Sequence, residues 1–216
     1  MNYAYTDFMI NKLSPLPDIL VTGYKEWKSS TFKKNSSKFK KLASLGQKPH
    51  SMVISCCDSR VHPTSILGAE EGELFIHRNI ANIVPPFSPD GDQNCTSAAL
   101  EYATKELKVR YLIVLGHTDC GGIKSGFNLH PNYKNSDYLF IAKWLSLLEP
   151  AFKNISKSGS KKNQINQLEE ESIKCSLNNL FSFPSVKKGV EEKKLSIHGL
   201  IHDIGSGNLK YLNPNY

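Results

Sequence analysis

A chain of 216 residues with 39% hydrophobic and 22% charged residues can bury a core as one globular domain, and this composition argues against a disordered chain. The formal charge of +7 would suit an acidic partner, but the lysines are scattered over residues 25–48, 153–162 and 187–194, and no nucleic-acid motif accompanies them. This pattern indicates a solvated basic surface and no nucleic-acid partner.

The sequence also argues against membrane insertion and secretion. No apolar run approaches the roughly 18 residues that a membrane helix requires. The first 20 residues lack the basic start and apolar core of a secretory signal. Five cysteines form no disulfide framework, and the pair Cys56–Cys57 before Asp58 fits metal-bound thiols in a reducing compartment. We therefore expect a cytoplasmic protein without a membrane partner.

The chain begins with a segment that we expect to be separate from the core. Residues 1–21 contain two prolines and no periodicity, which predicts an extended arm. Residues 22–46 carry an imperfect apolar stripe, which predicts N-terminal helices broken near residues 35–37. Such a stripe has to cover an apolar surface, either in the chain's own core or on a neighbouring subunit.

Strands and helices alternate through the rest of the chain. Apolar runs rich in β-branched and aromatic residues predict strands at 52–54, 73–78, 111–116 and 194–204, and residues 209–213 could add an edge strand. Helical periodicity is found at 94–108, 138–152 and 163–183. Alternation of this kind is typical of an α/β fold with right-handed crossovers. We expect a central, mostly parallel β-sheet of four strands plus the edge strand, flanked by helices, in a single domain over residues 1–216 with an α/β core at 50–216.

Metal-ligating side chains follow two of these strands. Cys56 comes after the run at 52–54, and His117 and Cys120 come after the run at 111–116. If the two strands are neighbours, these side chains converge, because the carboxyl ends of parallel strands lie at one edge of the sheet. Two thiolates and one imidazole suit zinc, and three protein ligands leave a fourth position open for catalysis. A structural zinc site and an unbound or redox-active thiol pair remain the alternatives.

Asp58 and Arg60 follow Cys56 closely and have a further role in this hypothesis. Zinc with two thiolates is formally neutral and a weaker Lewis acid than zinc on three imidazoles, so a nearby carboxylate would matter. Asp58 could bind the zinc or hold the nucleophile by a hydrogen bond. A planar, two-pronged contact with Arg60 would compensate the charge of Asp58. We therefore interpret the pair as a switch. Asp58 bound to zinc would close the site, and Asp58 paired with Arg60 would open it to water.

The chain resembles the β-class carbonic anhydrases from about residue 23 to its end, in three motifs: Cys56-x-Asp58-Ser59-Arg60, Arg78-Asn79-Ile80-Ala81-Asn82 and His117-x-x-Cys120-Gly121-Gly122. The resemblance implies reversible hydration of carbon dioxide to bicarbonate and a proton through a zinc-bound hydroxide. One Zn²⁺ per chain would be held by Cys56, His117 and Cys120. Asp58 would orient the hydroxide or bind the zinc in a closed state, and Arg60 would hold Asp58 off the metal.

The same resemblance implies a substrate pocket and an oligomer. In plant-like members the pocket positions correspond here to Gln47, Phe75, Ile80, Tyr102 and Gly121. Sites of this family lie at a dimer interface, so a homodimer or a dimer-based oligomer is implied. Members with an allosteric bicarbonate pocket carry tryptophan where this chain has Val53, although Arg78 matches that pocket's arginine. We therefore expect the open form, with Asp58 paired to Arg60.

Two further functions stay open on the sequence alone. A zinc hydrolase of the same fold could act on a substrate like carbon disulfide or carbonyl sulfide. A non-catalytic zinc-binding module is the other alternative, but such a module would be expected to lack Asp58 or Arg60, and the chain has both.

Overall fold

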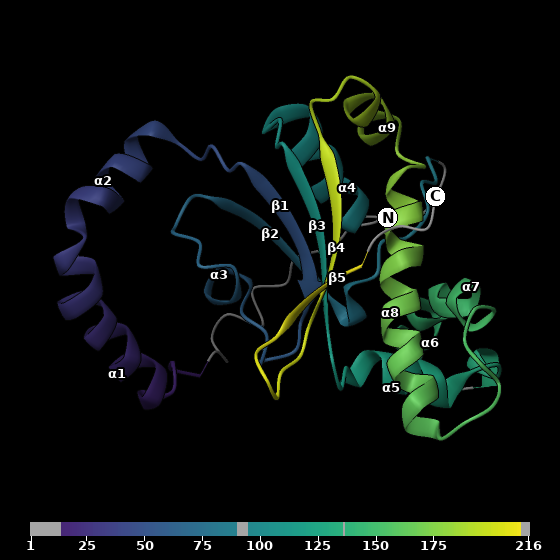
Figure 1. Cartoon of the computed structure of the whole chain (residues 1–216). Helices are drawn as coiled ribbons and strands as arrows, with labels where there is room; N and C mark the ends of the chain where they lie inside the picture. The colour runs from purple at the N-terminus through teal and green to yellow at the C-terminus, as the bar shows by residue number, and fades with distance from the viewer. Residues whose placement is uncertain (1–13, 90–94, 136, 213–216) are drawn as a thin grey trace, which may run out of the picture. The chain divides into compact units, whose positions relative to one another are not determined.

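A computed structural model describes residues 14–89, 95–135 and 137–212 (Figure 1). The chain divides into two compact units, Met1–Gln47 and Lys48–Tyr216, and each is described by itself. The boundary falls where the sequence predicts that the N-terminal helices end and the α/β core begins.

The N-terminal unit consists of two α-helices joined by a π-helical turn. Helix α1 covers Asp18–Trp27, the turn η2 covers Lys28–Phe32 and α2 covers Ser36–Leu45. None of the residues in these three elements is buried. The aromatic rings of Tyr24, Trp27, Phe32 and Phe39 lie 5.3–6.3 Å apart between centroids. These ring contacts connect α1, η2 and α2.

The predicted extended arm is wrong for residues 18–21, which form the first turn of α1. Residues 1–13 lie outside the described residues, so the prediction stays untested there. Pro17 precedes the helix at φ −55° and ends the extended segment. Proline is compatible with a helix start because the first N–H groups have no intrahelical acceptor, and Asp18 adds a favourable negative charge there. The proline therefore marks a helix start, whereas the prediction treated it as part of the arm.

The second unit is organised around a five-stranded sheet with the order β2-β1-β3-β4-β5. The strands are β1 Ser51–Cys56, β2 Leu74–Asn79, β3 Tyr111–His117, β4 Ser196–His202 and β5 Leu209–Leu212. The first four are parallel, and β5 pairs with β4 in the antiparallel direction at one edge. The predicted α/β fold is confirmed, with the edge strand where the sequence placed it. Strand β1 is buried along its whole length, as expected for a strand inside a parallel sheet.

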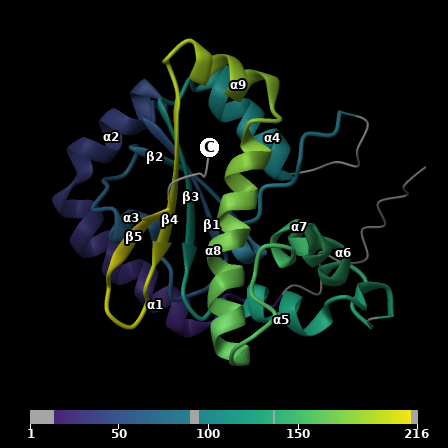
Figure 2. The ribbon, with the colours of Figure 1, turned by 45° about the vertical axis from the view of Figure 1, so that its right-hand side comes forward.

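Helices cover one face of this sheet. Figures 1 and 2 show α4, α8 and α9 along that face, and α5, α6 and α7 gathered beside one end of α8. Their bounds are α4 Cys95–Glu101, α5 Gly121–Leu129, α6 Ile141–Leu145, α7 Glu149–Phe152, α8 Lys161–Leu180 and α9 Pro184–Glu191. The main core lies between the sheet and α8, where Ile54, Leu112 and Leu177 are fully buried. On the other face, the short helix α3 (Pro63–Ile66) packs over Val53 and Leu115.

Proline also explains two other differences from the predicted helices. The predicted helix at 138–152 is split into α6, a 3₁₀ turn at Ser146–Leu148 and α7, and Pro150 lies in the first turn of α7. Pro184 ends the predicted helix at 163–183, but it also begins α9, which the sequence prediction missed. Both prolines lie at helix starts, where a missing N–H costs nothing.

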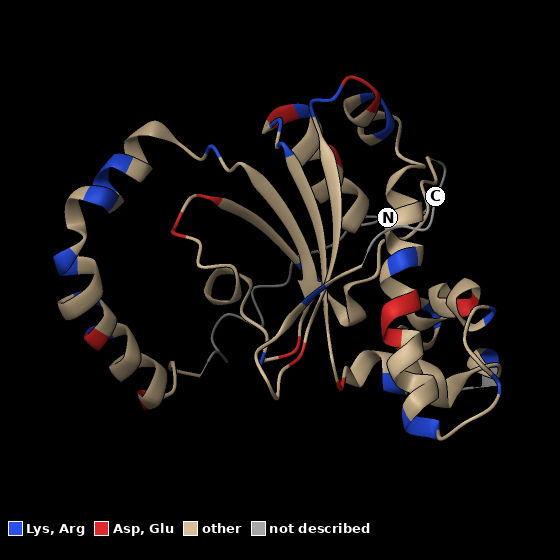
Figure 3. Cartoon of the chain, in the orientation of Figure 1, with Lys and Arg blue, Asp and Glu red and all other residues tan. Residues whose placement is uncertain are grey.

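The surface carries its positive charge over both units. Figure 3 shows Lys and Arg on α2, on α9 and around α8, so these residues are spread over several elements. Within the described ranges, no helix combines the length and the apolar character that crossing a bilayer requires.

The first turn of α5 packs against a strained turn, η3 (Ile80–Asn82), that follows β2. Ala81 and Asn82 have φ values of 65° and 47°, a left-handed conformation that costs about 1–2 kcal/mol per residue. A Cβ atom on Gly122 would lie 2.8 Å from Ile80 Cγ2 and 3.2 Å from the Ala81 nitrogen. Only glycine therefore fits at position 122.

We expect Gly122→Ala to lower the free energy of unfolding by about 1–3 kcal/mol, because the methyl group would overpack this contact. Urea unfolding measures the change. Gly121→Ala is the matched control, since a Cβ there would meet no atom within 4 Å. Equal stability of the two variants would contradict the packing described here.

Candidate metal centre

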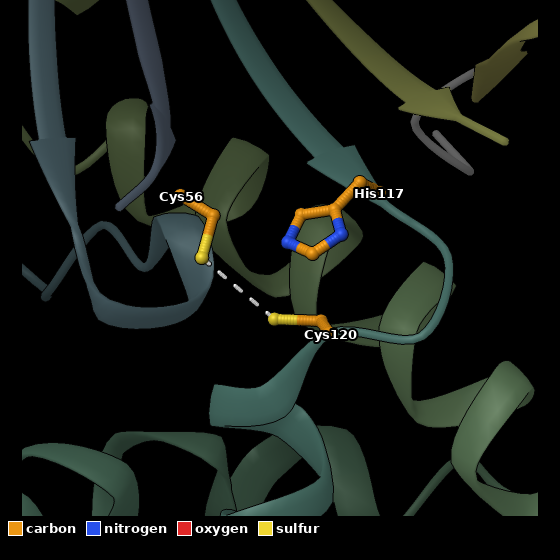
Figure 4. Close-up of side chains that lie close together, drawn as sticks. All are labelled: Cys56, His117 and Cys120. Atoms are coloured by element: carbon orange, nitrogen blue, oxygen red, sulfur yellow. Dashed lines mark hydrogen bonds between the residues drawn. The ribbon is translucent and has the colours of Figure 1, made fainter. Parts of the chain in front are cut away.

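Three metal-ligating side chains meet at the carboxyl ends of two inner strands of the sheet (Figure 4). Cys56 ends β1, His117 ends β3 and Cys120 immediately precedes α5. The two strands are neighbours, and the register pairs Ser55 with Leu115, so Cys56 lies within one residue of the level of His117. The ligand atoms of the three residues all lie within 4.8 Å of one another, and all three side chains are buried.

The geometry fits a tetrahedral zinc ion. The Sγ atoms of Cys56 and Cys120 are 3.9 Å apart. Two sulfurs bound to one zinc at about 2.3 Å with a tetrahedral angle would stand about 3.8 Å apart. Among the described residues, no fourth Cys, His, Asp or Glu joins this group. Three ligands and an open position are characteristic of catalytic zinc, whereas structural sites have four.

The imidazole of His117 is oriented for metal binding. Its Nδ1–H donates to the carbonyl oxygen of Thr118 at 2.9 Å, and because a carbonyl only accepts, Nδ1 carries the proton. Nε2 is then a lone-pair donor, and it is buried without a hydrogen-bond partner in the described part of the chain. A buried nitrogen of this kind needs a ligand, and a metal ion would supply it.

The Sγ atoms of Cys56 and Cys120 are hydrogen-bonded to each other, and both accept hydrogen bonds from backbone N–H groups. The hydrogen bond from Cys120 lowers the pKa of Cys56 to about 4, helped by the N–H groups of Asp58 and Ala81. The same hydrogen bond, together with burial, raises the pKa of Cys120, while the N–H groups at the start of α5 oppose the rise. A divalent cation between the sulfurs would replace the shared proton.

The strained turn at Ala81 is held by the residues around it. The Asn79 side chain donates to and accepts from the backbone of Ile83, at 2.9 Å in each case. Trp144 Nε1–H donates to the carbonyl oxygen of Ile80 at 2.8 Å. Three hydrogen bonds at about 1 kcal/mol each offset the cost of the left-handed residues. The turn thereby directs the Ala81 N–H toward the Cys56 sulfur.

Asp58 is held by Arg60 beside the three donors. Nε–H of Arg60 donates to Oδ1 at 2.9 Å, Nη2–H donates to Oδ2 at 2.7 Å, and the Arg60 backbone N–H donates to Oδ1 at 3.0 Å. These side-chain hydrogen bonds hold the pKa of Asp58 well below its usual range. Oδ2 lies 3.8 Å from His117 Nε2, so the carboxylate borders the centre without belonging to the donor group.

Arg78 has a structural task that sequence reasoning did not assign. Its guanidinium donates to three carbonyl oxygens at the end of β1 and in the loop that follows, those of Cys56, Asp58 and Val61, at 2.7–2.8 Å. Arg78 lies on β2, paired with Ser55. The pairing of β1 with β2 would have revealed this role, but the sequence alone does not give it. Arg78 thus fixes the loop that carries Asp58 and Arg60.

Glu169 on α8 is a second residue that sequence reasoning missed. Its Oε1 accepts a hydrogen bond from the backbone N–H of Cys120 at 2.9 Å, and its side chain is only 3% exposed. Burial raises the pKa of Glu169 to about 7. In the sequence it is one of three consecutive glutamates, and nothing there separates it from Glu170 or Glu171.

The residues of the expected substrate pocket lie in different places. Ile80 contacts the first turn of α5, which begins with Gly121. The rings of Phe75 and Tyr102 are 5.9 Å apart, and Gln47 belongs to the N-terminal unit. A cavity of about 790 Å³ includes Ile80, Arg78 and Trp144 in its lining, but none of the other four pocket residues.

An α/β protein with a buried Cys₂His group and an open fourth position has the architecture of a zinc enzyme. The family model of carbonic anhydrase matches residues 51–209, and the chain belongs to the β-carbonic anhydrases, a family of enzymes. It is 38% identical over 200 residues to β-carbonic anhydrase 3 of Arabidopsis thaliana, covering 91% of this chain and 76% of that protein.

The chain is also similar to solved structures of β-carbonic anhydrases. The chain matches the β-carbonic anhydrase CcaA with a TM-score of 0.82 and 29% identity, over 92% of each chain. It matches one of the tetrameric β-carbonic anhydrases of the ascomycete Sordaria macrospora with a TM-score of 0.76 and 30% identity, over 91% of this chain and 96% of that one.

We expect the Asp58–Arg60 contact to add pH-dependent stability that Arg60→Met removes. Because the folded pKa of Asp58 is depressed, this stability is present above the ordinary value of 3.8 and is lost as the pH falls through the lower folded pKa. The difference between wild type and Arg60→Met, from urea unfolding of chelator-treated protein, should be constant above about pH 5 and shrink below it.

Arg110→Met is the control, since the Arg110 guanidinium lies over the Tyr111 ring, 5.6 Å from its centroid. Its effect should not change with pH in this range. A pH-independent difference for Arg60→Met as well would mean that the ion pair does not form.

Proposed function

We propose that this protein catalyses the reversible hydration of carbon dioxide to bicarbonate and a proton, with one zinc ion per chain. The observation that carries the proposal is the buried Cys₂His group beside an Arg-bound carboxylate. Membership of the β-carbonic anhydrases supports it. Cys56, His117 and Cys120 are the proposed zinc ligands. When bound, zinc would act as a Lewis acid that lowers the pKa of water to near neutrality.

Asp58 and Arg60 are the proposed catalytic residues. Asp58 remains ionised because Arg60 depresses its pKa, so at neutral pH it can only accept hydrogen bonds. It would orient the attacking oxygen by accepting a hydrogen bond from it. Arg60 occupies both carboxylate oxygens and would keep Asp58 from becoming a zinc ligand, which corresponds to the open form.

The substrate pocket that we propose consists of Gln47, Phe75, Ile80, Tyr102 and Gly121. An apolar wall suits carbon dioxide, and the amide of Gln47 could donate to the bicarbonate oxygen. A homodimer or a dimer-based oligomer would bring such residues together from two subunits. The tetrameric proteins of Sordaria macrospora support an oligomer.

We further propose that both units form one functional domain. We also propose that the protein works in a reducing compartment such as the cytoplasm, which keeps the thiols free.

We expect Cys56→Ser to abolish both zinc binding and hydration, because it removes one of three ligands. Zinc analysis together with stopped-flow carbon dioxide hydration, with and without a chelator, measures both. Cys175→Ser is the matched control, since Cys175 is outside the donor group, and it should keep both properties. Zinc-loaded wild type that hydrolysed carbonyl sulfide but did not hydrate carbon dioxide would be a hydrolase. With neither activity it would be a binding module.

We expect Asp58→Asn to keep its zinc but to lose about 100-fold or more in kcat, because an amide cannot replace the carboxylate as an acceptor in the same orientation. The rate is measured on samples of equal zinc content. Glu192→Gln, which changes an exposed carboxylate directly after α9 that pairs with Lys194, should leave kcat unchanged. Full activity of Asp58→Asn would contradict the role of Asp58.

We expect Gly121→Ala to retain zinc and stability but to lose about tenfold or more in kcat/KM, because its methyl group would enter space meant for the substrate. Stopped-flow kinetics at several carbon dioxide concentrations measure the loss. An unchanged kcat/KM would remove Gly121 from the pocket.

A further inference from the structure

The turn between β3 and α5 is held at each of its three residues. Thr118 is held from β4 and the loop after it: its N–H donates to the His202 carbonyl at 2.9 Å, and its hydroxyl accepts from the Ile204 N–H at 3.2 Å. The Asp119 carbonyl accepts from Arg60 at 3.1 Å. The Cys120 N–H donates to Glu169 at 2.9 Å. Of these contacts, the one from Glu169 fixes the backbone of a metal ligand.

This turn needs fixing because its backbone is strained. Asp119 has a φ of 54°, in the left-handed region that a non-glycine residue seldom adopts. The next residue is Cys120, whose sulfur is only two bonds from its Cα atom. A rotation of the peptide plane between Asp119 and Cys120 would therefore displace the sulfur. A metal site tolerates errors of only about 0.2 Å in its ligand distances.

Glu169 itself is a costly residue in this position. It lies on α8 and is buried, and its Oε2 has no hydrogen-bond partner among the residues that the structure describes. A buried carboxylate with one unpaired oxygen loses solvation that a single hydrogen bond does not replace. Apolar residues of similar volume are often at least as stabilising at buried sites. Fold stability alone therefore does not account for Glu169.

We propose that Glu169 is a positioning residue of the metal centre, which fixes the Cys120 backbone so that its sulfur faces Cys56 and His117. This inference rests on the metal centre proposed above and adds a residue outside its ligands and outside the Asp58–Arg60 pair. The position of the acceptor oxygen is what matters, because the contact is a hydrogen bond to a neutral backbone N–H.

Two variants separate the position of the acceptor from its charge. Glu169→Gln keeps an oxygen at the same reach and removes the charge, whereas Glu169→Asp keeps the charge and withdraws the oxygen by one methylene group. We expect Glu169→Asp to bind zinc at least tenfold more weakly than wild type, and Glu169→Gln to lose less than tenfold. Competition against a chromophoric zinc chelator measures the affinity of each purified protein.

A spectroscopic readout and a structural control complete the experiment. In the cobalt-substituted proteins, the thiolate-to-metal charge-transfer band should change for Glu169→Asp and stay as in wild type for Glu169→Gln. Ser176→Ala removes another buried acceptor of α8, which binds the Val84 N–H at 3.1 Å. It should lower the Tm of chelated and zinc-loaded protein equally and leave zinc affinity unchanged.

The outcomes separate the inference from the proposed function. Wild type that does not bind zinc would overturn the metal centre. Wild type that binds zinc, with Glu169→Asp within tenfold of it, would overturn the role of Glu169. A larger loss in Glu169→Gln than in Glu169→Asp would make the charge decisive, and equal losses would show that the position of the acceptor oxygen is not decisive; either result would also overturn it. If Glu169→Asp does not fold, amide exchange of Cys120 decides: protection in wild type and Glu169→Gln supports the inference, and free exchange overturns it.

Discussion

Two sulfur atoms 3.9 Å apart in a buried site cannot both be negative unless a cation lies between them. With a proton between them, Cys56 is the thiolate and Cys120 the thiol, as the opposite directions of their pKa shifts indicate. A divalent cation displaces that proton and allows both charges. Backbone N–H groups at the Ala81 turn and at the start of α5 compensate part of the charge. The fold therefore prepares an anionic pocket before any metal binds.

The parallel sheet is what brings these donors together. Because β1 and β3 are neighbours in register, a cysteine that ends one strand lies next to a histidine that ends the other. The third donor depends on a strained turn and on the start of α5. Arg78, Arg60 and Glu169 hold the segments at and after the strand ends, and each of them makes at least one hydrogen bond to a backbone atom there. The ligands are thus fixed by strands and by contacts to main-chain groups.

The sequence predicts those features that local patterns determine. The apolar runs that precede Cys56 and His117 predict two strands. Because neighbouring parallel strands have their carboxyl ends on the same side of the sheet, they also predict that the donor group forms there. The start of α1 at Asp18, the start of α9 at Pro184 and the division of the 138–152 helix were missed, because a proline can begin a helix as well as end one. Glu169 was missed for another reason. Its role depends on how α8 packs near α5, and no local pattern distinguishes it from the glutamates beside it.

Arg60 connects its own loop to Asp119, which lies 59 residues further along the chain. The same Nη2 group donates to Asp58 and to the carbonyl oxygen of Asp119, one residue before Cys120. A swing of the carboxylate toward the metal would leave the guanidinium with one anchor fewer. The turn bearing a sulfur ligand would then lose part of its support. If Asp58 acts as the proposed switch, its movement would therefore affect the position of the Cys120 sulfur as well as access to the metal, because Arg60 contacts both segments.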